Sequence, residues 1–216
     1  MPRYSYKNLR PYLITCIVLL VVGGVALMAY LDFATPVSKP EVTGIVAATP
    51  PQSLATNPND TSYSVPALHP KYLKAQKVGL NARVQSVGLT EEGVIDAPRT
   101  AWEGGWYNDS ALPGSGQGVV FIDGHVNDAL NTPGIFYRLA DLAKGDTISI
   151  IRGDDTEVTY SVAGVEQQPL SEVDMKQLLT STDPAREGLT LVTCGGSYDR
   201  EKKTFTERVI VYGVRQ

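Results

Sequence analysis

The chain has 216 residues, 43% of them apolar and 19% charged, which is ordinary for a globular protein of one domain with or without an appendage. The charges before residue 32 are Arg3, Lys7 and Arg10; beyond them 16 basic and 23 acidic residues remain, a net charge of −7 that argues against nucleic acid as a partner. Two cysteines and two histidines exclude a disulfide-stapled scaffold, a Cys-rich zinc site and a His-rich metal site.

Residues 11–31, PYLITCIVLLVVGGVALMAYL, form an uncharged apolar segment between Arg10 and Asp32. As a helix, this segment spans roughly 30 Å, the thickness of the hydrocarbon core of a bilayer. Because positive charges precede it, we expect residues 1–10 in the cytoplasm, a transmembrane anchor over 11–31, and the rest of the chain outside the cell. A cleaved signal peptide is the alternative, although its apolar region is usually shorter, about 7 to 15 residues.

Residues 32–66 have the composition of a stalk. Positions 35–66 hold six prolines, with Lys39, Glu41 and Asp60 as the only charged residues, and no apolar periodicity persists. Such a segment buries too little apolar surface to offset its chain entropy. We therefore expect an extended, Pro-stiffened spacer that holds residues 67–216 away from the membrane.

Residues 67–216 carry many short β signals and few helical ones. Strands are predicted at 84–89, 94–95, 118–125, 147–152, 157–165, 189–194 and 208–214. The turn Gly153-Asp154-Asp155 indicates a hairpin, and residues 135–142 and 172–179 have the pattern of short helices. Seven or eight strands with minor helices are typical of a closed β-barrel or a sandwich, and about 150 residues suffice for a core without disulfides.

Cys194 is the one cysteine outside the apolar N-terminal segment, and it ends a predicted strand directly before Gly195 and Gly196. A thiol at a strand end, beside two residues without side chains, is open to the backbone of a substrate. An unused exposed thiol is a liability outside the cell, which favours a nucleophile. A small buried hydrophobic residue is the alternative, because position alone does not establish thiolate character.

A nucleophilic cysteine needs an acid or base within hydrogen-bond reach, and the chain offers His69 and His125. His69 precedes Pro70 where the stalk joins the domain, and we expect it to be a solvated surface residue. His125 ends the strand 118–125 and can face Cys194 from the same sheet. A turn histidine bonded within its own loop is the alternative for His125.

The oxyanion that thiolate attack creates needs a donor, and Arg208 opens the strand that follows the strand of Cys194. In a strand, Arg208 shares one face with Ile210 and Tyr212, whereas Arg215 falls on the other face. We therefore expect Arg208 rather than Arg215 to serve the site. A surface arginine paired with a nearby carboxylate is the alternative.

The run Thr190-Leu191-Val192-Thr193-Cys194 resembles the Thr-Leu-x-Thr-Cys motif of the sortases, membrane-anchored cysteine transpeptidases of bacterial cell surfaces. The order His125, Cys194, Arg208 and the spacing of these residues fit that family. The likeness covers about residues 71–214 and is closest in pattern to the class F and class E sortases. Further matching pieces, in collinear order, are Val87-Gly88-Leu89-Thr90, Gly105-Trp106-Tyr107, Pro113-Gly114, Gly124-His125-Val126, Phe136-Tyr137-Arg138-Leu139, Gly145-Asp146 and Gly195-Gly196-Ser197-Tyr198-Asp199.

The resemblance implies a mainly β fold, an eight-stranded sortase-type barrel with short helices over residues 67–216. It implies that the Cys194 thiolate attacks a peptide bond, that His125 protonates the leaving amine and deprotonates the incoming one, and that Arg208 holds the substrate and the oxyanion. Thr193 and Gly195 would line or support the substrate groove beside the nucleophile. We carry over no metal ion and no other cofactor.

The implied partners are surface proteins with a C-terminal LPxTG-like sorting signal and an amine of the cell wall, such as a peptidoglycan precursor. The enzyme would act at the cell membrane with its catalytic domain outside. The alternatives are an inactive sortase-like module that binds a wall polymer or a partner protein, and another extracellular Cys/His enzyme. Against the latter, the Ser-His-Gly-Cys run of L,D-transpeptidases is absent, and papain-like folds place Cys before His.

Overall fold

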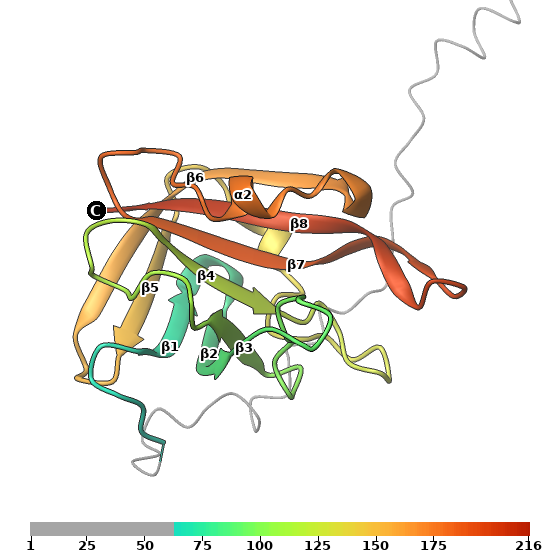
Figure 1. The fold of residues 1–216 in the computed structure, drawn as a ribbon, viewed down its shortest axis with the longest axis horizontal. Helices are drawn as coiled ribbons and strands as arrows, with labels where there is room; N and C mark the ends of the chain where they lie inside the picture. Colours follow the sequence, from blue (N-terminus) through green and yellow to red (C-terminus); the bar gives the residue numbers. More distant parts are fainter. Residues whose placement is uncertain (1–62) are drawn as a thin grey trace, which may run out of the picture. The chain divides into compact units, whose positions relative to one another are not determined.

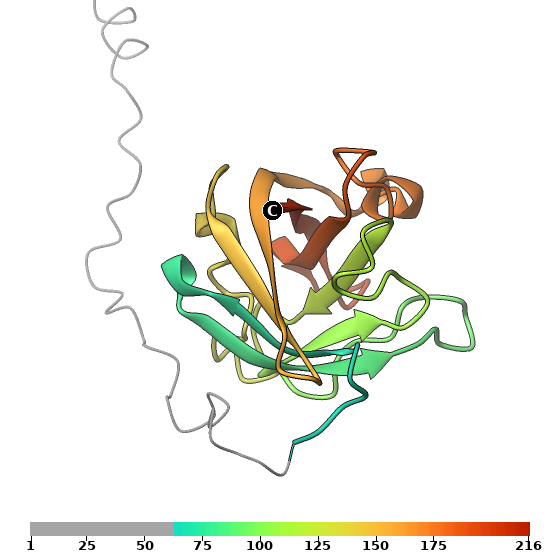
Figure 2. The same cartoon turned by 90° about the vertical axis from the view of Figure 1, so that its left-hand side faces the viewer.

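The computed structural model describes residues 63–216, in which eight strands form a closed barrel (Figure 1). The strands are β1 (Pro70–Ala75), β2 (Leu80–Val87), β3 (Glu103–Tyr107), β4 (Val119–Gly124), β5 (Thr147–Arg152), β6 (Glu157–Pro169), β7 (Gly188–Asp199) and β8 (Thr204–Arg215). Their order around the barrel is β1-β2-β3-β4-β7-β8-β6-β5. Neighbours are antiparallel except for the parallel pairs β2–β3 and β4–β7. Figure 2 shows the barrel from a second side.

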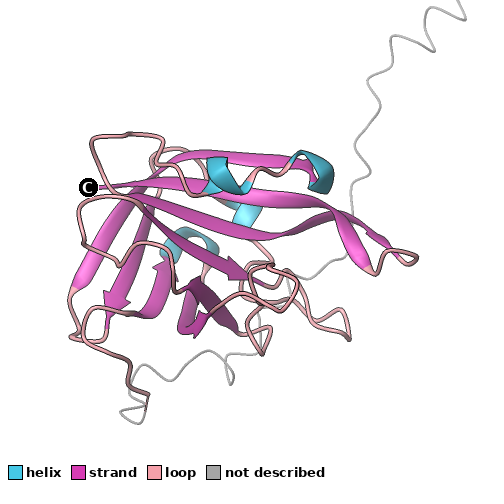
Figure 3. Cartoon of the chain, viewed as in Figure 1, coloured by secondary structure: helices cyan, strands magenta, loops and turns pink. Residues whose placement is uncertain are grey.

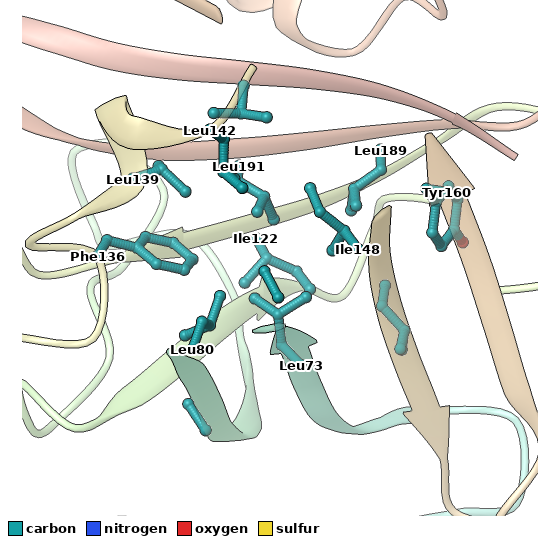
Figure 4. Packing of buried hydrophobic residues seen from close by; sticks show 14 of the residues in the cluster. Leu73, Leu80, Ile122, Phe136, Leu139, Leu142, Ile148, Tyr160, Leu189 and Leu191 are labelled. Carbon is teal, nitrogen blue, oxygen red and sulfur yellow. The ribbon is translucent and has the colours of Figure 1, made fainter. Parts of the chain in front are cut away.

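The interior of the barrel is a single apolar core built from alternate residues of the strands. Fully buried members include Leu73, Ile122, Ile148, Tyr160 and Leu191, which point toward one another in Figure 4. Removing each such side chain from water is worth about 1.5–3 kcal/mol, which offsets part of the chain entropy lost on folding. The core therefore holds the strands, and the residues on their outer faces, in a fixed register.

The outer face of β4, β7 and β8 is also apolar. Phe121, Val192, Ile210 and Tyr212 form a second buried cluster there, together with Leu178 from the connection between β6 and β7. That connection contains the 3-10 helix η4 (Leu170–Glu172) and the short helix α2 (Met175–Leu178), drawn in cyan in Figure 3. Because these three strands are buried on both faces, they read as continuous apolar runs in the sequence.

The predicted barrel of eight strands is confirmed, and most of the predicted strands are present. Those at 118–125, 147–152, 157–165, 189–194 and 208–214 correspond to β4 through β8, of which the last three are longer than predicted. The segment 84–87 lies in β2, but Leu89 and Ile95 form only an isolated bridge, so the prediction of a strand at 94–95 is wrong. β1 and β3 are strands beyond those predicted.

Both predicted short helices are present, but each is shorter than predicted. Residues 135–142 contain only the 3-10 helix η3 (Leu139–Asp141), and residues 172–179 contain the single turn of α2. A further 3-10 turn, η2 (Gln76–Val78), separates β1 from β2. In residues 135–142 the buried side chains Phe136, Leu139 and Leu142 recur every three residues, a spacing that a 3-10 turn satisfies as well as an α-helix does.

The predicted transmembrane anchor over residues 11–31 lies outside the described residues, as does the stalk apart from its last few positions. Within residues 63–216, no helix has the length and apolar character needed to cross a membrane.

Candidate active site

Cys194 lies on the outer face of the barrel. Along β7, Leu189 and Leu191 belong to the interior core and Val192 to the outer cluster, so strand alternation turns Cys194 outward. The residue is half-buried and its thiol is free. Burial raises the pKa of the Cys194 thiol, the Arg208 guanidinium lowers that pKa, and the Asp123 carboxyl raises it. The net effect is a rise, so the resting group at neutral pH is the protonated thiol.

Arg208 faces Cys194 directly, because the two residues are cross-strand partners in the β7–β8 pair. Its Nη1 donates to the backbone oxygens of Phe205 at 3.1 Å and Glu207 at 2.8 Å, and its Nη2 donates to Thr204 Oγ1 at 3.3 Å. These bonds orient the half-buried guanidinium within its own hairpin.

Arg215 lies at the other end of β8, about 23 Å along the strand from Arg208 at the usual rise per residue. Its backbone N–H donates to the Glu187 carbonyl, and its guanidinium is 3.9 Å from the Glu187 carboxylate. The structure therefore brings Arg208, and not Arg215, next to the thiol.

His125 follows Gly124, the last residue of β4, and is half-buried. Its Nε2 is 2.9 Å from the backbone oxygen of Pro98. Since a carbonyl oxygen only accepts, Nε2 carries the hydrogen, and in the neutral ring Nδ1 is then the free acceptor. The parallel β4–β7 register pairs Asp123 with Val192, and the same register extended by two residues would place His125 opposite Cys194.

Thr193 and Gly195 flank the nucleophile. The Thr193 side chain is buried, and its Oγ1 donates to the Gly124 carbonyl at 2.7 Å, which fastens the end of β4 to β7 just before both His125 and Cys194. Gly195 has little space for a side chain, because a Cβ there would lie 3.1 Å from Val209 Cγ2. After Gly195 the β7–β8 register shifts, so the hairpin changes course directly beyond the site.

His69 lies away from this site. It precedes β1, which is four strands from β7 in either direction around the barrel. Its ring packs edge-on against Trp106, with ring centroids 4.8 Å apart, and the residue is half-buried. The prediction of a solvated surface histidine is therefore wrong, although the structure keeps His69 apart from Cys194.

Asp123 is an acidic residue of this face that the sequence analysis did not single out. The pKa of Asp123 is raised to about 7, mainly by burial. A backbone hydrogen bond lowers this pKa, and the nearby charge of Asp96 raises it. Its Oδ1 is shielded from solvent and has no hydrogen-bond partner within residues 63–216. The sequence feature that points to Asp123 is the presence of one acidic residue inside the otherwise apolar run GVVFIDGH. No group of three or more His, Cys, Asp or Glu residues suited to a metal ion occurs in the same described region.

A family model described as "Sortase domain" matches residues 73–216. The fold is similar to a lid mutant of sortase A from Corynebacterium diphtheriae, with 22% identity and a TM-score of 0.52 over 67% of this chain and 68% of that chain. It is also similar to a pilus-related sortase C of Group B Streptococcus, with 20% identity and a TM-score of 0.51 over 71% of this chain and 70% of that chain. A third similar structure is sortase C-1 from Actinomyces oris, with 20% identity and a TM-score of 0.51 over 67% of this chain and 72% of that chain. No curated protein matches the chain.

Proposed function

Because the chain belongs to the sortase family of cysteine transpeptidases, we propose that it cleaves a sorting signal in surface proteins and joins the new carboxyl end to an amine of the cell wall. The proposal rests on one observation about β7. Cys194 is the register partner of Arg208 in the β7–β8 pair, and on its other side β7 pairs with β4, whose last residue directly precedes His125. A nucleophile, an acid-base group and a cationic donor thereby share one face of a rigid barrel.

In the first half-reaction, neutral His125 accepts the proton of the Cys194 thiol at Nδ1, since Nε2–H is engaged by the Pro98 carbonyl. The thiolate attacks the carbonyl carbon of the scissile peptide bond. The carbon–nitrogen bond then breaks, and His125 returns the proton to the leaving amine. The product is a thioester between Cys194 and the N-terminal part of the surface protein.

In the second half-reaction, an amine resolves this thioester. Neutral His125 takes a proton from the incoming amine as its nitrogen attacks the thioester carbon. The carbon–sulfur bond breaks, the new amide leaves, and the Cys194 thiolate recovers its proton from His125. The resting thiol and the neutral imidazole are both restored.

Arg208 is the proposed donor to the oxyanion in both half-reactions. A guanidinium carries five N–H groups, so Arg208 can keep its bonds to Phe205 and Glu207 while it donates to a substrate oxygen. A donor fixed in advance needs no reorganisation when the negative charge develops, which is the source of its catalytic value. Thr193 supports this geometry by holding β4 to β7.

We further propose that residues 11–31 anchor the enzyme in the cell membrane, with residues 1–10 in the cytoplasm and the barrel outside. The uncharged apolar run and the positive charges before it support this arrangement. An anchored enzyme would meet secreted proteins with LPxTG-like signals, and peptidoglycan precursors, where both emerge from the membrane. Within the family, the runs Gly105-Trp106-Tyr107 and Cys194-Gly195-Gly196 support class F or class E.

The test is intact mass spectrometry of the full chain in detergent, incubated with LPxTG-like peptides. We expect a mass gain equal to the N-terminal half of one peptide, and no gain with Cys194→Ala. His125→Ala should slow the reaction roughly 100-fold or more, the usual value of acid-base assistance, while His69→Ala should not. Arg208→Lys should be slowed far more than its matched control Arg215→Lys. If Cys194→Ala still forms product, the proposed chemistry is wrong.

A further inference from the structure

Asp123 places a carboxyl group on the same outer face as the Cys194 thiol. On β4, Ile122 belongs to the interior core and Phe121 to the outer cluster, so alternation turns Asp123 outward. The β4–β7 register pairs Asp123 with Val192, which lies two residues before Cys194 on the same face. The carboxyl and the thiol are therefore diagonal neighbours on adjacent parallel strands, and the carboxyl is close enough to raise the pKa of the thiol.

The carboxyl is enclosed by β3 and by the connection between β2 and β3, residues 88–102. Gly105 of β3 is the register partner of Asp123, and a Cβ on Gly105 would overlap Asp123 Oδ1. Pro98 Cδ and Val87 Cγ1 each lie 3.2 Å from the same position. Asp123 Oδ1 is thus seated over a glycine beside apolar atoms, buried and without a hydrogen-bond partner within residues 63–216. An ionised carboxylate is costly in such surroundings.

The charged and titratable groups around Asp123 come from several elements. β3 presents only Gly105 at the register position, whereas the β2–β3 connection brings Asp96, a like charge. β7 brings Cys194, and the end of β4 carries His125. Arg208 lies one strand further, on β8, opposite Cys194. The thiol therefore lies between one acidic and one basic neighbour.

We propose that Asp123 is a positioning residue that acts through Cys194: its carboxylate adds to the burial of the thiol in opposing ionisation until His125 takes the proton. The effect requires the charged carboxylate and vanishes when the carboxyl is protonated. This role deepens the proposed transpeptidase function, and its catalytic consequence rests on that function.

The two pKa shifts agree with this arrangement. The pKa of Asp123 is raised to about 7, and the pKa of the Cys194 thiol is raised from an ordinary value that is already higher. As the pH rises, Asp123 loses its proton first, and the thiol then titrates beside a carboxylate. Removal of that carboxylate should therefore lower the pKa of the thiol only where Asp123 would have been ionised.

The test is the rate of Cys194 alkylation by iodoacetamide from pH 5 to pH 10, without peptide, in the full chain carrying Cys16→Ala. Only the thiolate reacts. We expect the ratio of the Asp123→Asn rate to the parent rate to be near 1 at pH 5.5. It should rise through pH 7 to roughly threefold or more by pH 8.5, because the variant thiol ionises at lower pH, and return toward 1 once both thiols are ionised.

A purely structural role would give a ratio that does not vary with pH, and such a flat profile would overturn the proposal. Asp123→Ala should reproduce the profile of Asp123→Asn, because both remove the charge. Asp96→Asn should move the onset to lower pH, because it removes the like charge beside Asp123. Asp109→Asn, on the exposed loop after β3, removes the same formal charge and should follow the parent.

The two proposals fail separately. If no peptide acylates Cys194, the transpeptidase function fails, while the alkylation profile still reports on Asp123. If peptides acylate Cys194 and the alkylation ratio stays flat in both Asp123→Asn and Asp123→Ala, only the role of Asp123 is overturned.

Discussion

At the scale of single residues, Thr193 holds the two sides of the active site together. Its buried hydroxyl donates to the carbonyl of Gly124, the last residue of β4, which directly precedes His125, and Thr193 itself directly precedes Cys194 on β7. Thr193→Val keeps the shape of the side chain but leaves that carbonyl without this donor, which should lower stability by about 1–3 kcal/mol. The value of kcat/KM should also fall, because His125 loses its fixed position beside the thiol. Urea unfolding and peptide kinetics measure the two effects.

Thr190→Val is the matched control for this prediction. Thr190 lies on the same strand, and its buried hydroxyl donates at 2.8 Å to the Leu178 carbonyl of the β6–β7 connection rather than to β4. We expect a similar loss of stability, with kcat/KM close to wild type under conditions where the variant is folded. If kcat/KM fell equally in both variants, Thr193 would contribute to stability only and would have no specific role in positioning His125.

The Asp123 carboxyl also predicts how stability depends on pH. Its pKa is about 7 in the folded chain, above the ordinary value of 3.8. Between these values the folded state holds a proton that the unfolded state has lost. The free energy of unfolding should therefore fall as the pH rises through this window, by up to about 1.4 kcal/mol per pH unit from this group.

Asp123→Asn isolates this contribution, because every other titrating group is common to both proteins. In urea unfolding, the stability of Asp123→Asn relative to wild type should increase steadily from pH 4.5 to pH 7. The opposite trend, or a difference that stays constant over this range, would mean that burial does not raise the pKa of Asp123.

At the scale of elements, one leucine fixes the β6–β7 connection over the outer face of β4, β7 and β8. Leu178 is fully buried in the outer cluster with Phe121, Val192 and Ile210. The four residues of α2 are too few to be helical on their own, so this packing is what keeps the turn in place. Leu178→Ala should cost about 2–5 kcal/mol of stability, the usual range for a buried leucine. Thermal unfolding and amide hydrogen exchange over residues 170–181 measure the effect.

The neighbouring residue supplies the comparison. Leu179 is 36% exposed, so Leu179→Ala should change stability by no more than about 0.5 kcal/mol and leave hydrogen exchange unchanged. A similar cost in both variants would show that the connection is held by its backbone rather than by the buried side chain.

The elements also show where sequence patterns were sufficient. β4, β7 and β8 are buried on both faces, so their continuous apolar runs identify them directly. β3 has two glycines in five residues and gives no such signal. Gly105 is explained by the side chains packed over it, those of Asp123, Pro98 and Val87, which are contacts that no local sequence pattern contains.

Some residues of the candidate site could be predicted from the sequence, and one could not. Cys194 and Arg208 lie in predicted strands and His125 at the end of one, so strand alternation and the family motif were enough to single them out. Asp123 was missed because its raised pKa depends on burial and on Asp96, which the β2–β3 connection folds against it. That connection has only an isolated bridge between Leu89 and Ile95, so its path cannot be read from hydrophobic periodicity.

At the scale of the whole molecule, one buried carboxylate joins several parts of the barrel. Glu187 directly precedes β7 and is fully buried. Its oxygens accept from the backbone N–H groups of Gly114 at 2.9 Å and Gly116 at 2.6 Å, from the Ser115 hydroxyl at 3.1 Å, and from the Tyr160 hydroxyl. The β3–β4 connection, β6 and the start of β7 therefore meet at one group, with the Arg215 guanidinium 3.9 Å away.

Glu187→Gln should lower the free energy of unfolding by roughly 3 kcal/mol or more, because an amide turns N–H groups toward buried donors and leaves them unpaired. Tyr160→Phe removes a single donor and should cost about 1–3 kcal/mol. Cys194 lies about 23 Å further along β7, at the usual rise per residue. Its alkylation rate below the melting temperature should therefore match wild type in both variants. If the rate instead changed in proportion to the loss of Tm, closure of the barrel and the geometry of the active site would form a single cooperative unit.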